Sequence, residues 1–304
     1  IRDRSTSRGI GDVYKRQVPA GHLVDASQYC QTERTSPTVS MESVMLSCNI
    51  AAYERLHGFT MDIPGAYLNA TLDDPHMVRF PSDLAAEYVS LYPEYADYLQ
   101  SDGSLLLLVT KAFYGLPESS EKWFRVVTAF LQENGFRNHP SDQGLWIKHE
   151  NGKKLIVCMW VDDFLGWTSS IAMRDWFESV VTARFGNSRI KTGKHLPFLG
   201  MSISQPSRQG EVFVSMLEYT KRIVGVAGVT SSANNPNHRY LSNPKPKTRE
   251  ARKIDSSKFL SLLMSAAFLG KRTRPEILTA LSILQTRSEN PDEYDMLALL
   301  HVYK

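Results

Sequence analysis

Two adjacent carboxylates, Asp162 and Asp163, are the side chains best suited to chemistry in this chain. They lie between two apolar runs, residues 155–161 and 164–167, so the segment predicts a β-hairpin with an acidic turn. Like charges side by side in a partly buried turn repel each other and lose hydration. A bound divalent cation would offset that cost, although a solvated turn without a function has the same pattern.

A second acidic position, Asp62, ends the short apolar stretch Phe59–Met61 in a similar way. Carboxylates at the ends of neighbouring strands could converge on two Mg²⁺ ions, which activate an attacking hydroxyl and stabilise a leaving oxygen. Nucleotidyl transfer uses this geometry. Asp62, Asp162 and Asp163 are therefore candidate metal ligands.

Five short strings carry a family resemblance. They are MDIPGAYLNA at residues 61–70, KAFYGL at 111–116, WVDD at 160–163, PFLGM at 197–201 and KRTRPEI at 271–277. In order and spacing they resemble the reverse transcriptase of copia-type LTR retrotransposons, and the resemblance covers residues 22–304.

The resemblance implies a fold and a reaction. The expected fold is an α+β polymerase right hand of fingers, palm and thumb, with a mainly antiparallel palm sheet backed by helices and a helical C-terminal segment. The implied activity is RNA-directed DNA polymerisation, in which the three aspartates hold two Mg²⁺ ions, or Mn²⁺. The implied partners are an RNA or DNA template, a primer strand, dNTP, and the RNase H and integrase segments of the same polyprotein. The implied location is a cytoplasmic virus-like particle with a nuclear phase.

Other site residues are assigned by the same resemblance. Tyr67 would hold its ring against the deoxyribose and exclude a 2′-hydroxyl, and the alternative is an ordinary core tyrosine. Tyr114 and Gly115 would line the nucleotide pocket, where glycine allows close backbone approach. Lys111 is the remaining candidate for anchoring the triphosphate.

A second hairpin is expected at the PFLGM string. Phe198, Leu199, Gly200 and Met201 resemble the primer grip, which holds the 3′ end of the growing strand. A hydrophobic turn with no such role would look similar.

The chain departs from the family pattern at three places. Where many relatives carry Lys-Gln-Ser-Pro-Arg, this chain has Pro117–Glu121, and Glu118 or Glu121 would repel a triphosphate if either faced the pocket. Trp160 replaces the usual Tyr before Val-Asp-Asp. Gly21–Val24 stands where basic residues of the fingers are usual.

Two alternatives from other classes remain open. One is an inactive retrotransposon relic that acts at most as a nucleic-acid-binding module. The other is a Mg²⁺-dependent phosphohydrolase that directs the same carboxylates at a water nucleophile. Tyr67 and the primer-grip string speak against the hydrolase, which needs neither a sugar gate nor a primer holder.

The amino-acid composition says less about the function than the motifs do. The 304 residues are 42% hydrophobic, enough for a large core, and the net charge of +3 permits nucleic-acid binding without demonstrating it. No apolar run reaches the roughly 18 residues that a membrane span needs. The cysteines, Cys30, Cys48 and Cys158, lack metal-ligand spacing and are typical of a reducing compartment. A basic cluster is either a flexible linker or a phosphate-contacting strip; it comprises Lys245, Lys247, Arg249, Arg252, Lys253 and Lys258.

Periodicity predicts the helices. One follows Ser40, a plausible N-cap, and two more carry the apolar faces of Trp123–Leu131 and Met173–Val181. These aromatic stripes indicate core positions. Three C-terminal helices are expected at residues 256–270, 275–287 and 292–304.

The expected organisation has five parts. Residues 1–17 resemble a translated adaptor, 18–203 the fingers and palm, 204–229 a thumb-like segment, 230–257 a linker, and 258–304 a helical connection toward a missing RNase H domain.

Overall fold

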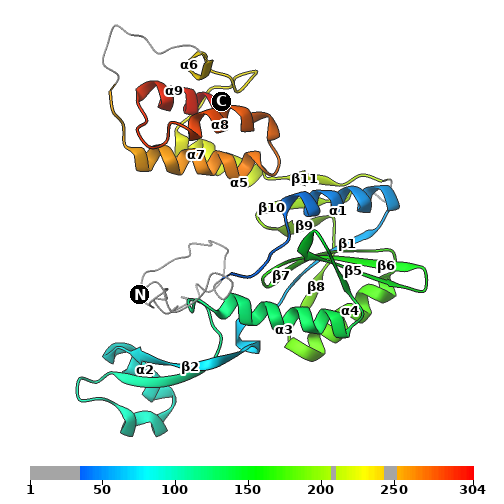
Figure 1. The fold of residues 1–304 in the computed structure, drawn as a ribbon, viewed down its shortest axis with the longest axis vertical. Coiled ribbons are helices and arrows are strands. Elements are labelled where there is room, and N and C mark those ends of the chain that lie inside the picture. Colours follow the sequence, from blue (N-terminus) through cyan, green and yellow to red (C-terminus); the bar gives the residue numbers. More distant parts are fainter. Residues whose placement is uncertain (1–34, 207–209, 243–251) are drawn as a thin grey trace. The chain divides into compact units, whose positions relative to one another are not determined.

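The computed structural model describes residues 35–206, 210–242 and 252–304 (Figure 1). The chain divides into two compact units. The first contains the described residues up to Ser43 together with Phe59–Lys191, and the second contains Val44–Gly58 together with Thr192–Lys304. Gly21–Val24, Cys30, Lys245, Lys247 and Arg249 lie outside the described residues.

Helices occupy the following segments: α1 Met41–Glu54, α2 Ser82–Leu91, α3 Ser119–Glu133, α4 Ile171–Phe185, α5 Leu217–Ala227, α6 Arg239–Ser242, α7 Ser256–Gly270, α8 Leu278–Gln285 and α9 Glu293–Val302. The described residues also form the 3-10 helices η4 Ala66–Asn69, η5 Pro93–Tyr98 and η6 Pro275–Ile277.

The strands are β1 His57–Asp62, β2 Thr71–Phe80, β3 Leu105–Lys111, β4 Arg137–His139, β5 Asp142–Glu150, β6 Lys153–Trp160, β7 Asp163–Thr168, β8 Arg189–Lys191, β9 His195–Phe198, β10 Met201–Ser204 and β11 Phe213–Ser215. They form a six-stranded sheet in the order β4-β5-β6-β7-β1-β8, a three-stranded sheet β11-β10-β9 and a two-stranded ribbon β2-β3. Every pair with an assigned register is antiparallel. The expected mixed architecture with antiparallel sheets is therefore confirmed.

The large sheet is built around the predicted acidic hairpin. β6 is buried from Leu155 to Met159, and β7 is buried from Phe164 to Thr168. Helices α3 and α4 lie against this sheet (Figure 1), and their apolar stripes form one core with it. The aromatic stripes predicted to be core are confirmed as core, since Trp123 and Phe177 are almost fully buried.

Gly166 allows β7 and β1 to lie side by side in the sheet. Gly166 of β7 faces the ring of Phe59 on β1, and a Cβ at residue 166 would lie 2.0 Å from Phe59 Cζ. Only a residue without a side chain lets that ring pack there. The ring of Phe59, on β1, thus packs on Gly166 of the neighbouring strand β7. β1 ends at Asp62.

Local signals explain the first helix and the small ribbon. Ser40 caps α1, because its hydroxyl accepts a hydrogen bond from the Ser43 N–H at 3.1 Å. The ribbon pairs Thr71–Phe80 with Leu105–Lys111, and α2 contacts its β2 strand. The helix predicted after Ser40 is confirmed.

The C-terminal unit contains the three predicted helices in the expected places. Asp292 and Asp295 form a capping box at the start of α9. The Tyr303 hydroxyl donates to the Leu262 carbonyl at 2.6 Å and ties the end of the chain to α7. Within the described ranges, no helix combines the length and the apolar character needed to cross a bilayer.

Candidate active site

The acidic turn connects β6 to β7 through two residues. The strands pair as far as Trp160 opposite Asp163, so Val161 and Asp162 form the turn itself. Val161 has φ of 56°, a left-handed conformation that is a genuine outlier for a β-branched residue. Such backbone strain amounts to about 1–3 kcal/mol and persists only when surrounding contacts hold it, often at functional sites.

The sheet order brings Asp62 to this hairpin. β1 is the neighbour of β7, and the Ile63 N–H, one residue after Asp62, donates to the Asp162 carbonyl at 3.0 Å. Burial raises the pKa of Asp163 to about 6, with further contributions from the charges of Asp162 and Asp62, while Lys191 opposes them. The three aspartates therefore lie at one end of the sheet, close enough for the charges of Asp162 and Asp62 to affect Asp163.

Their chemistry fits a hard divalent cation. Carboxylate oxygens are the ligands that Mg²⁺ prefers. A bound cation would stabilise the ionised Asp163, whose pKa is raised by burial and then by repulsion from Asp162 and Asp62. In the part of the chain that the structure describes, no three His, Cys, Asp or Glu side chains are gathered tightly enough to hold a metal ion. Metal ligation by Asp62, Asp162 and Asp163 stays a prediction.

Two tyrosines lie beside these carboxylates. The Tyr114 hydroxyl donates to Asp162 Oδ2 at 2.5 Å, and the Tyr114 ring packs on that of Tyr67 with centroids 4.4 Å apart. Burial, followed by the charge of Asp162, raises the pKa of Tyr67. Tyr67 stands on η4, directly after the turn at Gly65, whose φ is 64°. The predicted sugar gate is thus adjacent to the acidic hairpin, although its role stays a prediction.

Gly115 and Lys111 lie on either side of Tyr114. Gly115 has φ of 108°, which favours glycine there, in the turn between β3 and α3. Lys111 ends β3 opposite Thr71 and is exposed. No hydrogen bond or ion pair within the described residues joins Lys111 to the aspartates, so its assignment rests on the sequence resemblance.

The acidic residues that depart from the family pattern have partners inside the first unit. Glu118 is only 6% exposed, and its Oε1 lies 2.6 Å from His76 Nε2. Glu121 pairs with Arg125, and its Oε2 lies 3.6 Å from Lys122 Nζ. Lys122 and Arg125 offset the negative charge of Glu121, and Glu118 is hydrogen-bonded to His76.

The second predicted hairpin is present and belongs to the C-terminal unit. Phe198 of β9 pairs with Met201 of β10, and Leu199 and Gly200 form the turn between them. Phe198 and Met201 are buried, whereas Gly200 is exposed. The hairpin is confirmed, and its role as a primer grip stays a prediction.

Trp123 makes a contact with the acidic turn that its sequence pattern does not predict. This residue was predicted only as core, yet its indole Nε1–H donates to the carbonyl of Val161 at 2.8 Å. A helical apolar stripe predicts which face of a helix is buried, but it does not predict a hydrogen bond to a turn 38 residues away in sequence. Only the position of this tryptophan within the second turn of α3 was available as a signal.

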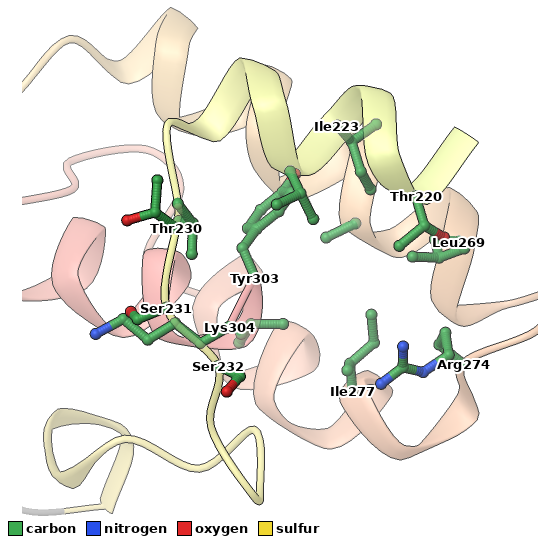
Figure 2. Close-up of a pocket in the computed structure, with 14 residues that line it drawn as sticks. Thr220, Ile223, Thr230, Ser231, Ser232, Leu269, Arg274, Ile277, Tyr303 and Lys304 are labelled. Atoms are coloured by element: carbon green, nitrogen blue, oxygen red, sulfur yellow. The ribbon is translucent and has the colours of Figure 1, made fainter. Parts of the chain in front are cut away.

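A separate cavity of about 360 Å³ lies in the C-terminal unit (Figure 2). Its lining is largely apolar, including Ile223, Leu269, Ile277 and Tyr303. The guanidinium of Arg274 lies at its edge and pairs with Glu276. None of the predicted site residues lines this cavity.

Comparison with known proteins identifies the class that this sheet and its acidic hairpin define. Residues 11–238 match the family described as reverse transcriptase (RNA-dependent DNA polymerase). Since the match covers most of the chain, the chain belongs to the reverse transcriptase family.

The relatives include proteins of transposons. A transposon Ty5-1 protein of Saccharomyces cerevisiae is 23% identical over 76% of this chain and 70% of its own length. The retrovirus-related Pol polyprotein from transposon RE1 of Arabidopsis thaliana is 22% identical over 90% of this chain. The corresponding polyprotein from transposon TNT 1-94 of Nicotiana tabacum is 20% identical over 84% of this chain. The chain spans only 17% and 19% of these two polyproteins. These findings confirm the resemblance to a copia-type element.

Among solved structures, telomerase from Candida albicans, in complex with a fragment of telomeric RNA, gives a TM-score of 0.35 at 11% identity. The alignment covers 93% of this chain and 52% of that chain.

Proposed function

We propose that this chain catalyses RNA-directed DNA synthesis at the carboxylates of Asp62, Asp162 and Asp163. In the reaction, the primer 3′-oxygen forms a bond to the α-phosphorus of a dNTP, the bond from that phosphorus to the bridging oxygen breaks, and pyrophosphate leaves. The observation that carries the proposal is the placement of β1 beside β7, which adds Asp62 to the acidic hairpin of a reverse transcriptase domain.

The three aspartates would hold two divalent cations. When bound, these ions supply activation of the primer hydroxyl and stabilisation of the charge on the leaving pyrophosphate. The raised pKa of Asp163 supports this assignment, because burial and the charges of Asp162 and Asp62 disfavour its ionised form, which a bound cation would stabilise.

The tyrosines would shape the nucleotide site. The Tyr114 hydroxyl orients the Asp162 carboxylate by its hydrogen bond, and the Tyr114 ring supports that of Tyr67. Tyr67 would then exclude a ribose 2′-hydroxyl by steric overlap. Gly115 lets the backbone approach the nucleotide closely, and Lys111 would contact the triphosphate.

Template and primer would be bound through their backbone phosphates, since a polymerase must copy any sequence. We assign the hairpin of Phe198–Met201 to the primer 3′ end. The subdomain names fingers, palm, thumb and connection, and an association with RNase H and integrase segments of a polyprotein, belong to the same proposal.

The test is primer extension by the full chain on a poly(rA) template with an oligo(dT) primer, dTTP and Mg²⁺. We expect primer-dependent incorporation that EDTA abolishes and that Mn²⁺ also supports. Release of phosphate from dTTP without a primer would indicate the phosphohydrolase. Tight binding of the template–primer without incorporation would indicate the inactive relic. The comparisons favour neither alternative.

A further inference from the structure

The turn that carries Asp162 is held from two other elements of the first unit. Trp123 of α3 donates its indole N–H to the Val161 carbonyl at 2.8 Å, and the Ile63 backbone N–H donates to the Asp162 carbonyl at 3.0 Å. Both carbonyls of the two-residue turn therefore have a donor from outside the hairpin. This arrangement fixes the orientation of both turn peptides.

The backbone at Val161 makes such support necessary. A β-branched residue at φ of 56° is strained, and an unsupported turn would relax toward an unstrained conformation. Rotation of the peptide that follows Val161 would move its carbonyl and, with it, the Cα of Asp162. A side-chain donor on that carbonyl opposes this rotation directly.

Packing alone does not require the indole N–H of Trp123. Trp146 belongs to the same core and is almost as deeply buried, yet its Nε1 has no hydrogen-bond partner among the described residues. The core therefore accommodates a tryptophan ring whose N–H makes no hydrogen bond. The bond from Trp123 to Val161 is an added feature of this position.

We propose that Trp123 is a positioning residue whose indole N–H holds the strained Val161 turn and thereby sets the direction of the Asp162 and Asp163 carboxylates. It acts through the turn and touches neither substrate nor metal. The effect expected on catalysis rests on the proposed polymerase function, whereas the effect expected on the position of the turn does not.

The test compares Trp123→Phe with Trp146→Phe. Both variants keep a buried aromatic ring and remove an indole N–H from the same core, but only the first removes a hydrogen bond. In ¹⁵N TROSY spectra, we expect Trp123→Phe to displace the backbone amide signals of Asp162 and Asp163 and Trp146→Phe to leave them near their wild-type positions. Equal displacement by the two variants, or none by Trp123→Phe, would overturn the proposal.

The kinetic comparison uses the same pair of variants. Because a displacement of about 1 Å in a reacting group can reduce rates by about 10²-fold, we expect Trp123→Phe to lower kcat for dTTP incorporation by about 10-fold to 100-fold. The KM for dTTP should change far less, and Trp146→Phe should retain wild-type kinetics. A rise in KM with unchanged kcat would contradict positioning. Wild-type protein that incorporates no nucleotide would refute the proposed function, and the spectra would still decide the role of Trp123.

A double-mutant cycle with Val161→Gly tests the route of the effect. Glycine adopts positive φ without strain, so the turn no longer needs the indole to hold it. Trp123→Phe should therefore displace the Asp162 and Asp163 amides less in the Val161→Gly background than in wild type. Strictly additive displacements would contradict action through the turn. If Trp123→Phe fails to fold, hydrogen exchange of the Trp123 indole in the wild-type protein decides, because rapid exchange would exclude a persistent bond to Val161.

Discussion

The β6–β7 and β9–β10 hairpins both reverse the chain through two residues, but their turns differ in how they are stabilised. In β9–β10, Leu199 and Gly200 both have positive φ, of 50° and 78°, as a type I′ turn requires. In β6–β7 the turn contains no glycine, and the positive φ falls on Val161. The β9–β10 turn is thus a common type of hairpin turn. The β6–β7 turn accepts hydrogen bonds from Trp123 of α3 and from Ile63, the residue after β1.

The difference between the two turns indicates that the β6–β7 hairpin has a role in chemistry. The β9–β10 turn places glycine at one of its two positions of positive φ, Gly200, where glycine is unstrained. The acidic hairpin instead keeps a strained valine next to two carboxylates, one of which has a raised pKa. Strain and like charge in one turn are destabilising, and proteins retain such features mainly where function requires them.

The largest effect should come from the acidic turn itself. Asp162→Asn should lower incorporation by on the order of 10³-fold, because it removes a charge that the reaction needs. The fold should persist, since the asparagine oxygen can still accept the Tyr114 hydroxyl. Primer extension and circular dichroism measure the two effects. The control is Asp175→Asn, an exposed carboxylate paired with Arg174 on α4. Wild-type activity in Asp162→Asn would show that this residue is not catalytic.

A smaller effect is expected from the tyrosine that stands beside the turn. Tyr67→Val should raise the kcat/KM for rNTP relative to dNTP by about 10-fold or more, because one steric contact discriminates by roughly 1–3 kcal/mol. Competing incorporation of rUTP and dTTP provides the measurement. Tyr53→Val, at a side chain that is 87% exposed, is the control and should leave the ratio unchanged. An unchanged ratio in an active Tyr67→Val enzyme would assign Tyr67 to the core alone.

The charge in the acidic turn should make stability depend on pH. The pKa of Asp163 is about 6 in the folded protein, above its ordinary value of 3.8, so the folded state binds this proton more tightly than the unfolded chain. Ionisation of Asp163 therefore destabilises the fold as the pH rises from about 4 to above 6. In EDTA, Asp163→Asn should match the wild type below pH 4 and should unfold at higher urea concentration above pH 6. The same difference at both ends of this range would contradict the raised pKa.

The smallest effect concerns the turn that relies on glycine. Gly200→Ala should lower the free energy of unfolding by about 1 kcal/mol, because alanine is strained at positive φ. Its Cβ would meet Met216 Cε at 3.9 Å, an ordinary contact, so the loss would report the backbone alone. Gly225→Ala is the matched control in helix α5, where a Cβ meets nothing and the same substitution should stabilise the protein. Urea denaturation that gives both variants the same sign would refute this account of the β9–β10 turn.

Much of the candidate site could be predicted because its parts are local. The apolar runs on either side of Asp162 and Asp163 predict the β6–β7 hairpin, and apolar spacing predicts α3, α4 and the C-terminal helices. Short strings also place Tyr67 and Tyr114 by resemblance to reverse transcriptases. The consequence of Glu118 could not be predicted, since its partner His76 lies 42 residues away on β2. A sequence departure that suggested repulsion of the nucleotide is instead a buried glutamate, hydrogen-bonded to His76.

Hydrophobic periodicity and turn residues act over a few residues, so the amino-acid sequence predicts the two hairpins, the helices that carry apolar stripes and the side chains that could do chemistry. Three further features follow from the packing of the folded chain: β1 lies next to β7, the Phe59 ring packs on Gly166, and Trp123 donates a hydrogen bond to Val161. These contacts form when strands and helices that are far apart in sequence pack around a common core, so the spacing of residues along the chain does not predict them. The position of Asp62 beside the acidic hairpin results from that packing.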